Sequence, residues 1–284
     1  MTSSSETDPD RDRAQQSGFE GRVSADRVDN LLHPLAVMVR ELLARAGSER
    51  DRIVIDDEDN VLQALAAGLT IDTVFFSGDG AISEKLLQRL PASVPIHEIA
   101  PRTCKKIFEK ERSSRVFAVA ARPAALPLER LLETPRDIVM VDNLSISGNL
   151  GAIIRTSLAL GAGGLVLLDG PLDLYDRRVI RASRGYLFSL PMASATADAL
   201  LAACKRRSRP VLVMTPDGDT PVDRLAGLPG PLAIALGSEK AGCSQALVEA
   251  ATWRVNIPMS PAVESLNVSA AAAITLFSRR PAGG

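Results

Sequence analysis

The sequence is poor in the residues that build disulfide frameworks and metal sites, with three cysteines and two histidines among 284 residues. Cys104, Cys204 and Cys243 are far apart and odd in number, unlike the paired cysteines of small secreted domains. No CxxC pair is present, and His33 and His97 leave little material for a zinc site or for a base beside a nucleophile. We therefore expect a protein that binds no metal and resides in a reducing compartment.

Long apolar segments are also missing. The longest run, residues 158–168, is shorter than the ~20 residues that a membrane-spanning helix needs, and glycines interrupt it. Residues 1–22 lack the apolar core of a signal peptide, and their acidic side chains argue against an organelle transit sequence. We expect a cytoplasmic protein without a membrane segment, with a disordered polar tail over residues 1–30 and a short tail over 280–284.

A strong net charge is absent as well, because 33 basic and 34 acidic side chains leave a formal charge of -1. This balance argues against a uniformly basic nucleic-acid binder, but it leaves room for a local basic face. Residues 101–123 contain seven basic and two acidic side chains, with Phe108 among them.

This basic segment has two interpretations. It can bind phosphates while Phe108 stacks on an unpaired base, or it can be an amphipathic helix with a solvated charged side and Phe108 in the core. On the first interpretation, the RNA-binding candidates are Phe108, Lys105, Lys106, Lys110, Arg112 and Arg115.

The pattern of apolar residues divides the chain into two modules. Over residues 31–121, helical spacing at 31–46 and 61–69 alternates with β-prone runs at 73–76 and 116–119, which predicts a small α/β module. Two prolines then favour extended backbone, and we place a linker at residues 122–136.

The second module, residues 137–279, alternates strands with helices. Apolar runs typical of buried strands lie at 137–141, 165–168, 211–214 and 232–236, and helices begin near Asn149, Thr196 and Ser244. This alternation predicts a parallel sheet. Ligands bind such sheets at loops beyond the carboxyl ends of the strands.

Three loops of the second module carry candidate site residues. They are Asn149-x-Gly151-x-x-x-Arg155, Gly237-Ser238-Glu239-Lys240-x-Gly242, and Ile257-Pro258-Met259 with Glu264-Ser265-Leu266-Asn267-Val268-Ser269. A helix start with small residues can receive a phosphate, an arginine can supplement it, and glycines allow a backbone to approach a ligand closely. Taken singly, the loops are also consistent with helix caps at Asn149, Gly151, Ser265 or Asn267 and with a solvated turn at 237–242.

In this order, the three loops resemble the motifs of the SPOUT class of RNA ribose methyltransferases. Residues 155–162 and 181–191 add a likeness to the thiostrepton- and nosiheptide-resistance 23S rRNA methyltransferases. The match covers residues 137–277. The resemblance implies an α/β protein, in which an L30e-like RNA-binding domain precedes a SPOUT domain with a parallel sheet and a deep trefoil knot. It also implies a homodimer.

The resemblance further implies roles for individual residues. The catalytic residues are Arg155, Glu239, Ser265 and Asn267, and S-adenosylmethionine is bound by Arg155, Arg184, Met214, Gly237, Ile257, Met259 and Leu266. A guanidinium with a pKa above ~12 is a poor proton acceptor, so we prefer phosphate binding and oxyanion stabilisation for Arg155. The cluster of Arg177, Arg178, Arg181 and Arg184 suits either RNA or a dimer interface.

We thus expect S-adenosylmethionine-dependent 2'-O-methylation of 23S rRNA, at the adenosine of the loop where thiopeptide antibiotics bind. Two alternatives stay open. One is a housekeeping tRNA or rRNA ribose methyltransferase of the same fold, and the other is a catalytically idle RNA-binding protein. The sequence alone does not fix the target nucleotide, because RNA specificity resides in shape and in loop contacts.

Overall fold

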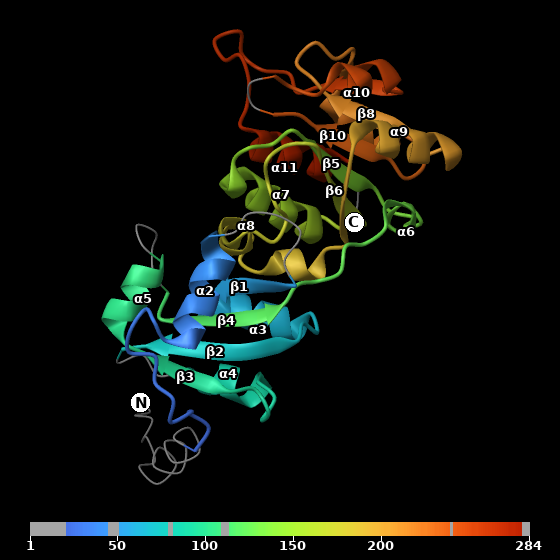
Figure 1. Ribbon diagram of the computed structural model, residues 1–284. Coiled ribbons are helices and arrows are strands. Elements are labelled where there is room, and N and C mark those ends of the chain that lie inside the picture. Colours follow the sequence, from blue (N-terminus) through green and yellow to red (C-terminus); the bar gives the residue numbers. More distant parts are fainter. Residues whose placement is uncertain (1–20, 45–50, 79–81, 109–113, 239–240, 280–284) are drawn as a thin grey trace, which may run out of the picture. The chain divides into compact units, whose positions relative to one another are not determined.

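Arg122 ends the first of two units into which the chain divides, and Pro123 begins the second. The computed structural model describes residues 21–44, 51–78, 82–108, 114–238 and 241–279 (Figure 1). The candidate site residues Lys110, Arg112 and Glu239 lie outside this part of the chain. Within it, no helix is long and apolar enough to cross a membrane.

The first unit is built on a four-stranded sheet in the order β1-β4-β2-β3. Its elements are α2 (Pro34–Ala44), β1 (Arg52–Asp56), α3 (Glu58–Ala66), β2 (Ile71–Ser77), α4 (Glu84–Arg89), β3 (Ile96–Ile99), α5 (Pro101–Phe108) and β4 (Val116–Ala121). β4 pairs antiparallel with β1 and β2, whereas β3 pairs parallel with β2. Val54, Phe75 and Phe117 pack against α2 and α5, and Figure 1 shows α3 and α4 on the opposite face.

Phe108 belongs to the core of this unit. Its side chain is 3% exposed, and its ring packs edge-on against Phe117 with the ring centroids 5.1 Å apart. The helical period places it on the same buried face as Cys104, four residues earlier, while Lys105 and Lys106 point to solvent. The prediction that Phe108 stacks on an unpaired base is therefore wrong, because the core already holds its ring.

Residues 21–30 lie along the outer edge of β3, which corrects the expectation of a disordered tail that reaches residue 30. Val28 forms a parallel bridge with Ile99, and its N–H donates to the backbone of β3 at 2.9 Å. The guanidinium of Arg22 donates to carbonyl oxygens in and just after α4. The segment thus covers an edge strand that would otherwise present unpaired backbone groups.

The second unit contains a seven-stranded parallel sheet in the order β7-β6-β5-β10-β8-β11-β9, as the alternating pattern predicted. Its elements are α6 (Leu128–Leu131), β5 (Ile138–Asp142), α7 (Ser147–Ala159), β6 (Gly164–Leu168), α8 (Arg177–Ala182), η1 (Tyr186–Ser189), β7 (Met192–Ala195), α9 (Ala197–Arg206), β8 (Val211–Met214), β9 (Thr220–Pro221), η2 (Val222–Gly227), β10 (Ala233–Leu236), α10 (Gln245–Ala250), β11 (Trp253–Asn256) and α11 (Val268–Ser278). Helices α6, α9 and α10 pack on one face, and α7 and α11 cover the other (Figure 1). Burial on both faces explains the unbroken apolar runs of β5, β6 and β10.

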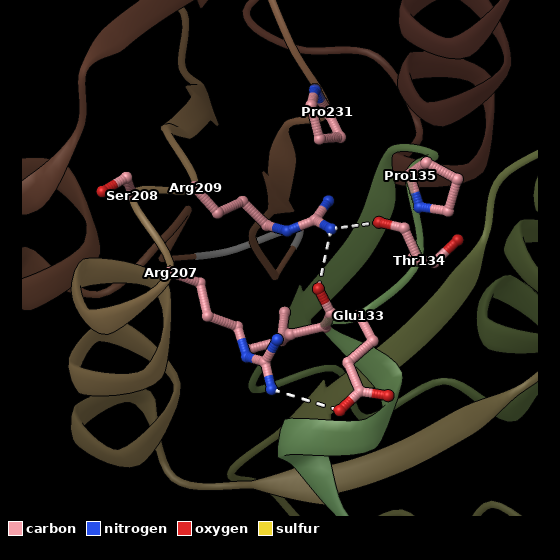
Figure 2. A pocket seen from close by; sticks show the side chains of 8 residues that line it. Glu133, Thr134, Pro135, Arg207, Ser208, Arg209 and Pro231 are labelled. Atoms are coloured by element: carbon pink, nitrogen blue, oxygen red, sulfur yellow. Dashed lines mark hydrogen bonds and ion pairs between the residues drawn. The ribbon is translucent and has the colours of Figure 1, made fainter.

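A polar hollow of about 370 Å³ lies at the amino ends of the parallel strands, where Thr134, Arg209 and Pro231 precede β5, β8 and β10 (Figure 2). The buried guanidinium of Arg209 donates to the carbonyl oxygens of Leu132 and Thr134, and burial lowers its pKa. These carbonyls lie within the expected linker, residues 122–136, whose second half is thereby attached to the second unit. We assign this hollow a structural role.

Candidate active site

The candidate loops lie near the position in the sheet where the order of the strands reverses. From β5 the chain continues to β6 on one side of the sheet, whereas from β10, the other neighbour of β5, it continues to β11 on the other side. In open parallel sheets, ligands bind outside the carboxyl ends of the strands at such a point. The three loops follow β5, β10 and β11, so the fold brings them to one edge of the sheet.

The first loop leads into α7, which begins at Ser147 and contains both Asn149 and Gly151 within its first turns. Neither residue is therefore the helix cap. A Cβ at Gly151 would lie 2.4 Å from the Cβ of Ala182 in α8, so only glycine allows the two helices to pack this closely. Arg155 lies one turn later on the same face of α7 and is exposed. It makes no hydrogen bond or ion pair with the residues that the structure describes, and it is open to a substrate.

The two ends of the second loop are hydrogen-bonded to each other, and the loop is attached to the end of β5. Ser238 and Gly242 exchange two backbone hydrogen bonds of 3.0 and 2.9 Å. A Cβ at Gly237 would lie 2.0 Å from the carbonyl carbon of Gly242, so a side chain does not fit there. Oδ2 of the buried Asp142 accepts a hydrogen bond of 2.6 Å from the backbone N–H of Ser244. The backbone of this loop is therefore held beside the start of the first loop.

Cys243 directly follows the second loop but is not suited to nucleophilic chemistry. Burial, with Asp142 nearby, raises the pKa of its thiol to about 12. Because the thiolate is the reactive form, the side chain is inert at neutral pH.

The third loop ends at Asn267, whose side chain makes two kinds of contact. Its Oδ1 accepts hydrogen bonds from the backbone N–H and the hydroxyl of Ser269, at 2.9 and 2.6 Å, which confirms the helix-cap interpretation. Its Nδ2 donates to Oδ1 of Asn149 in α7 at 3.2 Å. One side chain thus caps α11 and joins its start to the start of α7.

Apolar side chains border the same edge of the sheet. Met214 ends β8, Ile257 follows β11, and Met259 and Leu266 lie in the third loop. All four are half-buried, neither packed in the core nor fully open to solvent. Ligand sites are lined mainly by such apolar surface with a few polar groups, so these residues fit an adenine ring.

Two further residues hold this edge together and were not predicted. Besides Asp142, Asn256 contributes through its Nδ2, which donates to the carbonyl oxygen of Gly218 at 2.9 Å. A Cβ at Gly218 would lie 2.6 Å from the carbonyl carbon of Val255, so the loop after β8 rests directly on β11. The sequence held a signal for Asp142, which is the polar last residue of an apolar strand, whereas the strand that Asn256 ends is short and includes an arginine.

The structure does not gather the other predicted residues into this cluster. Those described are exposed, with Arg184 after α8, Ser265 in the third loop, and Lys105, Lys106 and Arg115 in the first unit. Within the described ranges, no three His, Cys, Asp or Glu side chains are arranged to hold a metal ion.

Comparison with known proteins gives matches over both units. The SpoU rRNA Methylase family model matches residues 137–277, and the model of the thiostrepton-resistance methylase N terminus matches residues 25–134. A 23S rRNA (adenosine(1067)-2'-O)-methyltransferase of Streptomyces laurentii is 37% identical over 265 residues, which cover 90% of this chain and 94% of that protein.

Solved structures agree with the fold. A crystal structure of an RNA 2'-O ribose methyltransferase is 29% identical, with a TM-score of 0.75, and the match covers 89% of this chain and 98% of that one. The SpoU methyltransferase AviRb of Streptomyces viridochromogenes, in complex with AdoMet, is 24% identical with a TM-score of 0.74, covering 86% of this chain and 96% of that one.

Proposed function

The chain belongs to the SpoU rRNA methylase family, and we propose that it transfers a methyl group from S-adenosylmethionine to the 2'-hydroxyl of adenosine 1067 in 23S rRNA. The observation that carries this proposal is the likeness to a methyltransferase of that nucleotide over 90% of the chain. The family that matches residues 25–134 is named for thiostrepton resistance. We therefore infer that methylation protects the ribosome against antibiotics of this class.

Methyl transfer would form a bond between the 2'-oxygen and the methyl carbon as the bond from that carbon to sulfur breaks. S-adenosylhomocysteine would leave as a neutral thioether, and the proton of the hydroxyl would pass to solvent water. S-adenosylmethionine, when bound, supplies the methyl group on a positively charged sulfur. The protein must align the hydroxyl behind the methyl group and exclude competing water. Alignment of this kind can supply about 7–11 kcal/mol of the barrier reduction.

Arg155 is the residue that we assign to the reacting ribose. Its side chain is exposed on α7, the helix into which the first loop leads. Because a guanidinium stays protonated at neutral pH, it does not act as the base. It binds the adjoining phosphate through its planar fork and stabilises negative charge that develops on the 2'-oxygen. Asn267 positions the start of α7 through its hydrogen bond to Asn149, and we assign Ser265 and Glu239 to the ribose.

The cofactor is assigned to the carboxyl edge of the sheet, which the residues there fit. Half-buried apolar side chains enclose the adenine, and the glycine backbone of the second loop approaches the cofactor closely. The residues assigned to it are Arg155, Arg184, Met214, Gly237, Ile257, Met259 and Leu266. We also assign to these loops the deep trefoil knot that the sequence resemblance implies.

RNA binding is assigned to the exposed basic side of α5 and its neighbours. Lys105, Lys106 and Arg115 are exposed there, and Phe108 is excluded by its burial. We extend this basic face to Lys110 and Arg112 on sequence alone. Phosphate contacts of this kind give affinity without reading the base sequence.

A homodimer is the assembly that we propose, and the cytoplasm, where ribosomal RNA resides, is the proposed location. The support for a dimer is apolar surface on the second unit. Ile146 before α7, Val263 in the third loop and Phe277 in α11 are 50%, 48% and 65% exposed. Helix α11 is apolar nearly all round, which is typical of a helix covered on several sides.

The proposed function is tested by incubating the protein with labelled S-adenosylmethionine and fragments of 23S rRNA, followed by mapping of the methylated ribose. We expect label at the 2'-oxygen of adenosine 1067, and no label when that position carries a 2'-deoxyribose. Methylation of another nucleotide would keep the reaction but overturn the target. Cofactor binding without methylation of any fragment would overturn the proposal.

A further inference from the structure

Because Phe108 is buried, a different aromatic side chain is needed to stack on an unpaired base of the RNA. Among the described residues, two aromatic side chains are exposed, Tyr186 at 38% and Phe277 at 65%. Tyr186 stands beside basic residues, because it follows Arg184 by two positions at the start of η1. Phe277 lies near the end of α11.

The chain reaches Tyr186 through an unusual turn. Arg184 and Gly185 both have positive φ angles, 52° and 72°, a conformation that is uncommon for a side chain as large as arginine. Backbone hydrogen bonds hold the turn, from the N–H of Gly185 to Ile180 and from the N–H of Tyr186 to Ser183. Conformations of this kind persist where the surrounding structure fixes them, and they are frequent at ligand sites.

This turn lies on the side of α7 that carries Arg155. The close contact of Gly151 with Ala182 and Ser183 shows that this face of α7 meets the end of α8, and η1 also packs on α7. Arg155 is one helical turn beyond Gly151 on the same face. Figure 1 shows α8 next to α7. Tyr186 and two exposed arginines therefore share one side of the second unit.

We propose that Tyr186 is the platform on which an unpaired base of the substrate loop stacks, while Arg184 and Arg155 hold the neighbouring phosphates. The proposal rests on the proposed function, because it assumes an RNA substrate. RNA loops are recognised by splayed bases on aromatic rings, and a tyrosine ring with two rotatable bonds loses little freedom when a base covers it. Stacking fixes the nucleoside without reading its edge, so the ribose hydroxyl is presented to Arg155 in one orientation.

The test compares Tyr186→Ala with Tyr186→Phe in the full chain, using the 23S rRNA fragment as substrate. Removal of the ring should raise the KM for RNA about tenfold, which corresponds to about 1.4 kcal/mol, within the range of a single stacked base. The Phe variant keeps the ring and should stay within about twofold of the wild type. The affinity for S-adenosylmethionine should be the same in all three proteins.

A second measurement reports the stack directly. A fragment with 2-aminopurine in the antibiotic-binding loop should lose fluorescence on binding the wild type and Tyr186→Phe, but not on binding Tyr186→Ala. Equal quenching and equal KM for the Ala variant would overturn the proposal. A change in its oligomeric state in sedimentation would also overturn it, by assigning the ring to a subunit contact. Failure of the wild type to methylate any fragment would count against the proposed function, whereas the comparison of variants by quenching tests the stack separately.

Discussion

Asn267 and Asn149 are 118 residues apart in the sequence, yet Nδ2 of the first lies 3.2 Å from Oδ1 of the second. This hydrogen bond joins the third motif to the first at the point where α11 and α7 begin. Because Oδ1 of Asn267 is already used to cap α11, the two ends of one amide serve two purposes. The pairing explains why an amide stands here, since a carboxylate would cap the helix without donating to Asn149.

The two roles of Asn267 can be separated by substitution. Asn267→Ala removes the cap and should lower the free energy of unfolding by about 1 kcal/mol. Asn267→Asp keeps the acceptor for the N–H of Ser269 but loses the donor to Asn149, so it should retain most of the stability and still lose turnover. Urea unfolding and single-turnover methylation measure the two effects. Wild-type turnover in the Asp variant would show that the link to Asn149 does not matter for the site.

Gly237→Ala should abolish cofactor binding. Its Cβ would lie 2.0 Å from the carbonyl carbon of Gly242, and relief of that overlap must open the second loop. Gly227→Ala is the matched control, because no heavy atom lies within 4 Å of its added Cβ. Calorimetric titration with S-adenosylmethionine should show no binding for the first variant and wild-type binding for the second. Unaltered affinity in Gly237→Ala would mean that this loop is not in contact with the cofactor.

Arg155→Lys retains the positive charge and loses the planar fork. We expect turnover on saturating RNA and saturating S-adenosylmethionine to fall about 100-fold, a typical effect of removing one donor from a developing oxyanion. Arg130→Lys is the control, since Arg130 pairs with Glu133 in a segment at the amino end of the sheet. Near wild-type turnover of Arg155→Lys would contradict the fork role.

If the basic face of α5 binds RNA phosphates, its lysines should contribute to the salt dependence of RNA binding. Neutralising Lys105 and Lys106 together removes two phosphate contacts and should reduce the slope of log affinity against log salt by about 1.4, at ~0.7 per contact for single-stranded RNA. A double variant of the exposed Lys85 and Lys205 removes the same charge elsewhere and should leave the slope unchanged. Equal slopes for the two double variants would assign α5 to structure alone.

Stability at alkaline pH should depend on Cys204. Burial raises the pKa of this thiol to about 11, whereas an unfolded thiol titrates near about 8.5. The folded state therefore keeps a proton that the unfolded state releases. The stability of the folded state is unaffected by this thiol below about pH 8.5 and falls as the pH rises toward 11. Urea unfolding between pH 8 and pH 10 should show a steeper decline for the wild type than for Cys204→Ala, by up to about 1.4 kcal/mol per pH unit. Parallel declines would contradict the shifted pKa.

Local patterns predicted the four central strands of the sheet in the second unit and three of the helices of that unit. The apolar run at 211–214 is a strand with those bounds, the run at 165–168 is a strand that begins one residue earlier, and helices begin within two residues of Asn149, Thr196 and Ser244. Shorter or more polar strands such as β7 and β11 escaped prediction, because their few residues do not form a clear apolar run. The order and spacing of the motifs carried the family and, through it, the reaction.

By itself the sequence determined the α/β class, the parallel sheet and the motif loops, because apolar periodicity and strand-end residues are local properties of the chain. Only the tertiary structure decided which contacts those residues make. It placed Phe108 in the core although its neighbours are basic, and it paired Asn267 with Asn149 across 118 residues. A helical period states which residues share a face, but the packing of the whole unit decides whether that face meets a core, a partner loop or water.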